Sequence, residues 1–131
     1  MSATAAPRLT SFAPQLLVDD LESAIRFYRD VLGFSFGPVW GGFYAIGERD
    51  GFAVHLKCAP KTAEDREHRR QHEHLDVYAG VTGVRALYDA CTAKGATILK
   101  PLAPTAWGTV DFYIEDPEGY IIAFGENENS G

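Results

Sequence analysis

The sequence predicts an α+β fold of two βαβββ repeats whose curved sheets enclose a ligand cleft. Three patterns indicate it: a helical pattern that occurs twice, a strand pattern before each helix, and a turn-linked pair of strands that ends each half. A sheet that its helix covers on one face turns its other face toward something else. Two such sheets that curl together leave a cleft between them, which favours a small-molecule site.

The first helix is predicted within residues 20–33. Its apolar residues recur at helical spacing, and these are Leu21, Ile25, Tyr28 and Leu32. Asp20 is suited to cap the N-terminus of this helix, and Gly33 supplies its C-terminal stop. Both ends of an amphipathic helix are therefore marked.

The same pattern recurs within residues 82–95, which identifies the chain as a duplication. Thr82 occupies the capping position and Gly95 closes the helix. The apolar stripe consists of Val84, Leu87 and Cys91. We therefore expect a second helix that is built like the first.

Strands are predicted on both sides of each helix. They cover residues 13–18, 34–40, 43–44 and 52–56 in the first half, and 74–79, 96–99, 112–113 and 120–124 in the second. A turn with Asp50-Gly51 joins the last two strands of the first half. In the second half Asp116-Pro117-Glu118-Gly119 fits a type I turn, because proline has the fixed φ that this turn needs and glycine ends it.

These elements make one structural domain with five segments. We expect an N-terminal segment (1–12), a first repeat (13–60), a charged linker (61–73), a second repeat (74–126) and a C-terminal tail (127–131). The linker has no apolar stripe, so it is expected to be a solvated connection.

The composition excludes several classes of protein. The 131 residues are 46% hydrophobic and 23% charged, which is typical of a globular domain, and a net charge of -6 disfavours nucleic acid as a partner. We find no signal peptide and no stretch long enough to span a membrane, so we expect a cytoplasmic protein without a membrane partner. Cys58 and Cys91 are expected to be reduced, small core residues.

Two segments resemble signatures of a known family. Residues 18–34 resemble the opening signature of the vicinal oxygen chelate superfamily of glyoxalases, bleomycin-resistance proteins and extradiol dioxygenases, and residues 116–126 resemble its closing one. The resemblance spans residues 13–126. It implies the paired βαβββ fold, and it implies a homodimer, because relatives often complete their clefts across a two-fold axis.

The resemblance also implies positions for a divalent metal ion, one on the first and one on the last strand of each repeat. Here they fall on Ala13, on His55, on His72 or His74, and on Ala123. Gln15 replaces Ala13 only if the strand slips by two residues. Because the two alanines have no ligating atom, we expect no cofactor, with a divalent metal ion held by His55 and His74 as the alternative.

Aromatic and acidic residues are the expected lining of the cleft. In the bleomycin-resistance branch aromatic rings stack on planar heterocycles, and here the candidate rings are Trp40, Tyr44, Tyr78, Trp107 and Tyr113. Their alternative role is to fill a core or a dimer contact. Asp76 and Asp111 are candidates to pair with a cationic ligand, or else are exposed strand residues.

Gln15 and His55 complete the expected lining. His55 projects to the cleft face, where it is a groove histidine hydrogen-bonded to a neighbour, a metal ligand or a general base. The cluster of His68, His72 and His74 suggests a zinc site by its spacing. Arginines of the linker would repel a cation there, so a solvated face is expected instead.

We therefore expect a metal-independent protein that binds a small molecule, planar or cationic, and resembles bleomycin-type proteins that sequester an antibiotic. The alternative is a metal-dependent glyoxalase-like lyase, isomerase or dioxygenase that acts on vicinal oxygens. A third hypothesis is a metal-free enzyme with His55 as its base.

Overall fold

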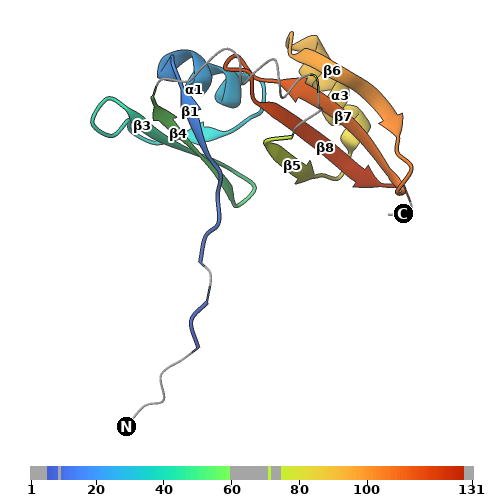
Figure 1. The fold of residues 1–131 in the computed structure, drawn as a ribbon, viewed down its shortest axis with the longest axis horizontal. Coiled ribbons are helices and arrows are strands. Elements are labelled where there is room, and N and C mark those ends of the chain that lie inside the picture. The colour runs from blue at the N-terminus through green and yellow to red at the C-terminus, as the bar shows by residue number, and fades with distance from the viewer. Residues whose placement is uncertain (1–5, 9, 60–70, 72–74, 129–131) are drawn as a thin grey trace.

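Two sheets, each covered on one face by a helix, lie side by side in the computed structural model of the chain (Figure 1), which describes residues 6–8, 10–59, 71 and 75–128. The first half contains β1 (Gln15–Val18), α1 (Leu21–Asp30), β2 (Ser35–Phe36), β3 (Tyr44–Arg49) and β4 (Phe52–Cys58). The second contains β5 (Val77–Gly80), α3 (Val84–Ala93), β6 (Thr97–Pro104), β7 (Thr109–Glu115) and β8 (Ile121–Asn127). This confirms the predicted fold class.

The strand order shows the duplication directly. The sheets have the orders β1-β4-β3-β2 and β5-β8-β7-β6. In each sheet the first strand of the half pairs in parallel with the last one, and the other pairs are antiparallel. Each half is thus the same mixed sheet with one helix on one face.

The two helices begin differently, although their sequence patterns are alike. The side chain of Asp20 accepts a hydrogen bond from the Ser23 N–H at 3.0 Å, as predicted. At α3 the cap is Gly83, with φ of 75°, so the predicted capping role of Thr82 is wrong. The N–H groups of Gly83 and Val84 donate instead to Oε1 of Glu126 on β8. A carboxylate from another element has replaced the local cap.

The strand that follows α3 is longer than its sequence pattern predicts. β6 has eight residues, whereas alternation predicted only residues 96–99. It is an edge strand, it contains Pro101 and Pro104, and its register with β7 shifts at two places. Edge strands tolerate proline and irregular pairing, and both disturb the alternation that marks a strand in the sequence.

The two halves share one apolar core, and polar groups join them at the turn between β7 and β8. The Tyr28 hydroxyl on α1 donates to Asp116 Oδ2 at 2.7 Å. The other oxygen of Asp116 accepts from the N–H groups of Glu118 and Tyr120, each at 2.8 Å. Asp116 is only 3% exposed, so this carboxylate is both buried and fully occupied.

The same turn also binds the backbone of the first half. The Glu118 carboxylate accepts from the N–H groups of Asp19 and Asp20, at 2.7 and 3.1 Å. The Tyr120 hydroxyl donates to the carbonyl of Leu17 at 2.6 Å and accepts from its N–H at 2.9 Å. The turn that the sequence identified as a hairpin is therefore also the joint between the halves.

Some expectations fall outside the residues described. The linker 61–73 does so except for Gln71, and so do His68, His72 and His74. Both cysteines are free thiols: Cys91 is buried as predicted, but Cys58 is exposed at the end of β4. Among the described helices, none is long and apolar enough to cross a membrane.

The carboxylate of Glu118 provides a test of the joint. In Glu118→Gln the amide oxygen accepts one hydrogen bond, and its NH₂ group faces the second backbone donor. We expect the free energy of unfolding to fall by about 1–3 kcal/mol, measured by urea denaturation. Glu22→Gln, an exposed position of α1, is the matched control. Equal stabilities of the two variants would contradict the joint.

Tyr28 provides a second test, in alkali. Burial raises the pKa of Tyr28 well above its ordinary value of 10.0, and the charge of Asp116 adds to the rise. The folded state thus holds this proton more tightly than the unfolded state, so its contribution to stability is complete below about pH 10 and is lost as the pH rises through the folded-state pKa.

Tyr28→Phe should therefore cost about 2 kcal/mol at neutral pH, since a hydrogen bond to a buried carboxylate is lost. It should also decline less in stability above pH 10 than the parent. Urea denaturation as a function of pH measures both effects. A parallel decline of the two proteins in alkali would argue against the raised pKa.

Candidate functional site

The open face of the first sheet carries three of the predicted site residues. The side chains of Leu16, Val18, Val54 and Leu56 are buried on the helix side. Gln15, Tyr44 and His55 alternate with them and lie on the opposite, open face. The parallel register places Gln15 directly beside His55.

These three side chains form one hydrogen-bonded network. The Gln15 amide Nε2 donates to the Tyr44 hydroxyl at 2.9 Å. The same hydroxyl lies 2.7 Å from Nδ1 of His55, and the two rings pack edge to face with centroids 5.6 Å apart. His55 is thus hydrogen-bonded to a neighbour and held in a fixed orientation.

The open face of the second sheet brings together Tyr78 on β5 and Asp111 on β7. The Tyr78 hydroxyl donates to Asp111 Oδ1 at 3.2 Å. Gly125 on the strand between them makes this possible, because a Cβ there would collide with the hydroxyl and with the carboxylate. A glycine on the central strand therefore provides the recess in which these two groups meet.

Asp111 is the buried carboxylate of this face, so its alternative role as an exposed strand residue is wrong. It is 5% exposed, and its Oδ2 has no hydrogen-bond partner among the described residues. Burial, followed by the charge of Asp111, raises the pKa of Tyr78, which keeps the phenol protonated as the donor. The second oxygen is thus a buried acceptor without a donor among the described residues.

Asp76 has a different role from Asp111. It is half-buried at the start of β5, and its Oδ2 accepts a hydrogen bond from the N–H of Ile121 at 2.8 Å. The Asp76 N–H donates in turn to the Ile121 carbonyl. Asp76 therefore fixes the beginning of β8 against β5.

The remaining aromatic candidates are distributed over both halves. Trp40 is 61% exposed and precedes β3, where it forms an isolated bridge with Tyr44. Trp107 is 68% exposed in the turn between β6 and β7. Tyr113 is half-buried, and the Lys100 ammonium lies 5.1 Å from its ring centroid. The two tryptophans belong to different halves of the chain and make no ring contact with each other.

The strand registers decide which residues occupy the positions that the resemblance associates with a metal ion. Gln15 pairs with His55, and Tyr78 pairs with Ala123. Tyr78 is thus the counterpart of Gln15, so Asp76, two residues earlier, is the counterpart of Ala13. His74, the expected candidate, lies outside the described residues.

This set of residues does not fit a metal ion. Ala13 and Ala123 have no ligating atom, which leaves His55 and Asp76 as the described residues at these positions. Within the described part of the chain, no three His, Cys, Asp or Glu side chains are grouped so that they could hold a metal ion. A catalytic cation needs about three protein ligands.

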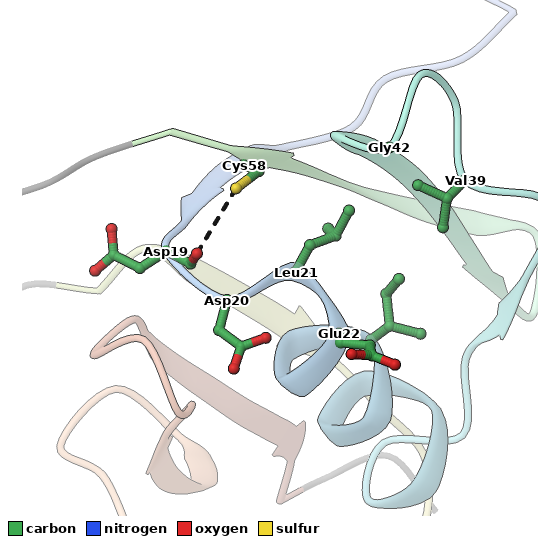
Figure 2. A pocket seen from close by; sticks show the side chains of 8 residues that line it. Asp19, Asp20, Leu21, Glu22, Val39, Gly42 and Cys58 are labelled. Atoms are coloured by element: carbon green, nitrogen blue, oxygen red, sulfur yellow. Dashed lines mark hydrogen bonds between the residues drawn. The ribbon is translucent and has the colours of Figure 1, made fainter.

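A pocket that no pattern of the sequence predicts lies on the helix side of the first sheet (Figure 2). It has a volume of about 530 Å³ and lies at the N-terminus of α1. Its lining consists of Asp19, Asp20, Leu21, Glu22, Ile25, Val39, Gly42 and Cys58. In the sequence the acidic residues within 19–22 indicate only the start of a helix. The pocket lies apart from the open-face residues described above.

Comparisons with known proteins agree on one family. Residues 8–124 match the family model of the Glyoxalase/Bleomycin resistance protein/Dioxygenase superfamily. A lactoylglutathione lyase of Haemophilus influenzae is 33% identical over 124 residues, which cover 88% of this chain and 90% of that protein. A probable lactoylglutathione lyase of Vibrio cholerae is 26% identical over 124 residues, 88% of each chain.

Solved structures share the fold at low identity. TioX from Micromonospora sp. ML1 has a TM-score of 0.73 and 19% identity, with 90% of this chain and 98% of that chain covered. A glyoxalase/bleomycin resistance protein/dioxygenase from Nocardioides has a TM-score of 0.70 and 20% identity, with 97% and 89% covered. These likenesses concern the fold alone.

The recess at Gly125 can be tested by filling it. Gly125→Ala should lower the free energy of unfolding by about 1–3 kcal/mol, because the new methyl group displaces Tyr78 and Asp111. Gly80→Ala is the matched control, since a Cβ there meets nothing within 4 Å. The double variant Gly125→Ala/Tyr78→Phe should recover part of the lost free energy of unfolding, as measured by urea denaturation. An unchanged free energy of unfolding in Gly125→Ala would contradict the close packing at this position.

Proposed function

Because the chain belongs to the glyoxalase/bleomycin resistance protein/dioxygenase superfamily, we propose that it binds a small, partly aromatic molecule without the help of a metal ion. The function is that of a bleomycin-type protein that sequesters its ligand. One observation carries the proposal: alanines occupy two of the four positions at which metal-dependent relatives hold their ion, Ala13 and Ala123. Neither alanine side chain can ligate an ion.

The contacts of the ligand follow from the groups on those faces. The ligand stacks on the exposed rings of Trp40 and Trp107, which have large aromatic surfaces in contact with solvent. Charge complementarity falls to Asp111 rather than Asp76, because Oδ2 of Asp111 lacks a partner among the described residues. A ligand that is planar and carries a cationic N–H group suits both.

We further propose that the protein acts as a homodimer. The two tryptophans belong to different halves of one chain, so a second copy is a direct way to bring a first-half ring and a second-half ring to one ligand. We place this binding in the cytoplasm, where both free thiols would persist in the reduced state.

A second candidate is a metal-dependent lyase on the glyoxalase pattern. The 33% identity to a protein named lactoylglutathione lyase favours it. It needs ligands from His55 and from His74, which lies outside the described residues, together with a replacement for the two alanines. Metal binding and ligand binding therefore separate the two candidates.

Intrinsic tryptophan fluorescence tests the proposed binding directly. Planar, cationic heterocycles should quench the fluorescence saturably at one ligand per chain, in the presence of excess EDTA. Trp107→Phe should remove part of the quenching, and Asp111→Asn should weaken binding about fivefold to fiftyfold, as expected for one charge-assisted hydrogen bond. Asp89→Asn, an exposed position of α3, is the matched control.

Thermal melting in added Ni²⁺, Zn²⁺, Mn²⁺ or Fe²⁺ tests the metal-dependent alternative. A ligand that binds only the folded state raises the melting temperature by mass action. We expect no shift from these ions. A shift with stoichiometric metal content that disappears in His55→Ala would overturn the proposal and favour the lyase.

A further inference from the structure

We propose that Gln15 and Tyr44 hold His55 as the tautomer protonated at Nε2, so that His55 donates a hydrogen bond to an acceptor oxygen of the bound molecule. The inference rests on the proposed small-molecule binding and adds a chemical class to it. The ligand would carry a carbonyl or carboxylate oxygen next to its planar part. His55 is then a residue that determines specificity.

The direction of the hydrogen bonds in this network depends on where the single hydroxyl proton of Tyr44 lies. A tyrosine hydroxyl has one proton to donate and lone pairs to accept with. The Gln15 N–H donates to the Tyr44 oxygen at 2.9 Å and occupies one of its lone pairs, and we assign the hydroxyl proton to the remaining contact, with Nδ1 of His55 at 2.7 Å. Nδ1 is therefore the acceptor, and in the neutral ring the proton resides on Nε2.

The sheet fixes this arrangement mechanically. β4 is flanked by β1, which places Gln15 beside His55, and by β3, which carries Tyr44 two residues from the position that pairs with His55. The Tyr44 and His55 rings meet at an interplanar angle of 87°. Both the hydrogen bond and the edge-to-face packing restrict rotation of the imidazole, so Nδ1 stays directed at Tyr44.

Nε2 is available to a ligand. It makes no hydrogen bond with any described residue, and it is not among the buried polar atoms that lack a partner. The half-buried ring therefore has one nitrogen engaged in the sheet and one without a hydrogen bond to the described residues. Lys57 lies on the same open face, opposite Tyr44 in the register, and adds a positive charge. Both groups suit an acceptor oxygen.

This assignment separates His55 from its other hypothetical roles. A neutral imidazole with its proton on Nε2 presents no lone pair outward, whereas a metal ligand or a general base needs one. Either role through Nε2 would require the proton on Nδ1, with Nδ1 donating to the Tyr44 oxygen instead of accepting from it. The direction of the hydrogen bond between Tyr44 and His55 thus distinguishes a donor role of Nε2 from these two roles.

The tautomer can be read from ¹⁵N resonances of the imidazole. In ¹⁵N-labelled protein above neutral pH, we expect Nε2 of His55 to have the chemical shift of a protonated nitrogen and Nδ1 that of an unprotonated one. The spectrum of His55→Gln identifies the signals among the four histidines. Tyr44→Phe should move the population toward a mixture, while Tyr88→Phe, the same change on α3, should not. An unprotonated Nε2 in the parent protein overturns the assignment.

Three indoles with one ring system test the chemical class. Indole-3-acetate and indole-3-acetamide each carry an acceptor oxygen, charged or neutral, and 3-methylindole carries none. We expect the first two to bind more tightly than 3-methylindole, as measured by calorimetry. Tyr44→Phe should weaken them about fivefold, the effect of one hydrogen bond, and leave 3-methylindole unchanged. The ratio of acetate to acetamide measures the part that Lys57 contributes.

The outcomes distinguish this inference from the proposed function. Equal affinity for all three indoles, unaffected by Tyr44→Phe, would overturn the role of His55 while stacking stands. If none of the three binds, 3-methylindole included, the stacking site itself is contradicted. Tighter binding of 3-methylindole than of the two oxygen-bearing indoles would also overturn the donor role.

Discussion

The joint at the β7–β8 turn is the constraint on which the rest of the structure depends. Two carboxylates, Asp116 and Glu118, are buried there, and each accepts hydrogen bonds from groups that would otherwise be unpaired. A buried charge is tolerated only when such donors surround it. The turn therefore fits one place on the first half, next to Tyr28 and the start of α1, and this place sets how the two sheets lie together.

Because each helix covers one face of its sheet, the network around His55 and the pair of Tyr78 and Asp111 lie on the other face. The first sheet offers donors there, from His55 and Lys57, and the second offers the acceptor Asp111. Both groups lie on strands with neighbours on either side, which orients them more firmly than a loop would. A molecule that contacts both faces would meet opposite hydrogen-bonding character at its two ends.

The duplication explains how one topology came to hold two different surfaces. Equivalent positions carry Gln15 and Tyr78 on the first strands, and His55 and Ala123 on the last. In the first half the central strand β4 carries the side chain of His55 on this face. In the second half the central strand carries the small residues Ala123 and Gly125, and the side chain of Tyr78 crosses this strand to reach Asp111. The backbone pattern tolerates both because the open face is not part of the apolar core.

The sequence by itself determined the repeat, both helices, the Asp20 cap, the hairpin turn and the alternation that places Gln15, Tyr44 and His55 on one face, because these depend on neighbours in the chain. Tertiary structure alone decided that Glu126 caps α3, that Asp111 is buried while Asp76 anchors β8, and that Asp76 is the counterpart of Ala13. Each of these depends on the register between strands far apart in sequence. Such a register is set by long-range pairing and by the buried joint, and no local pattern records it.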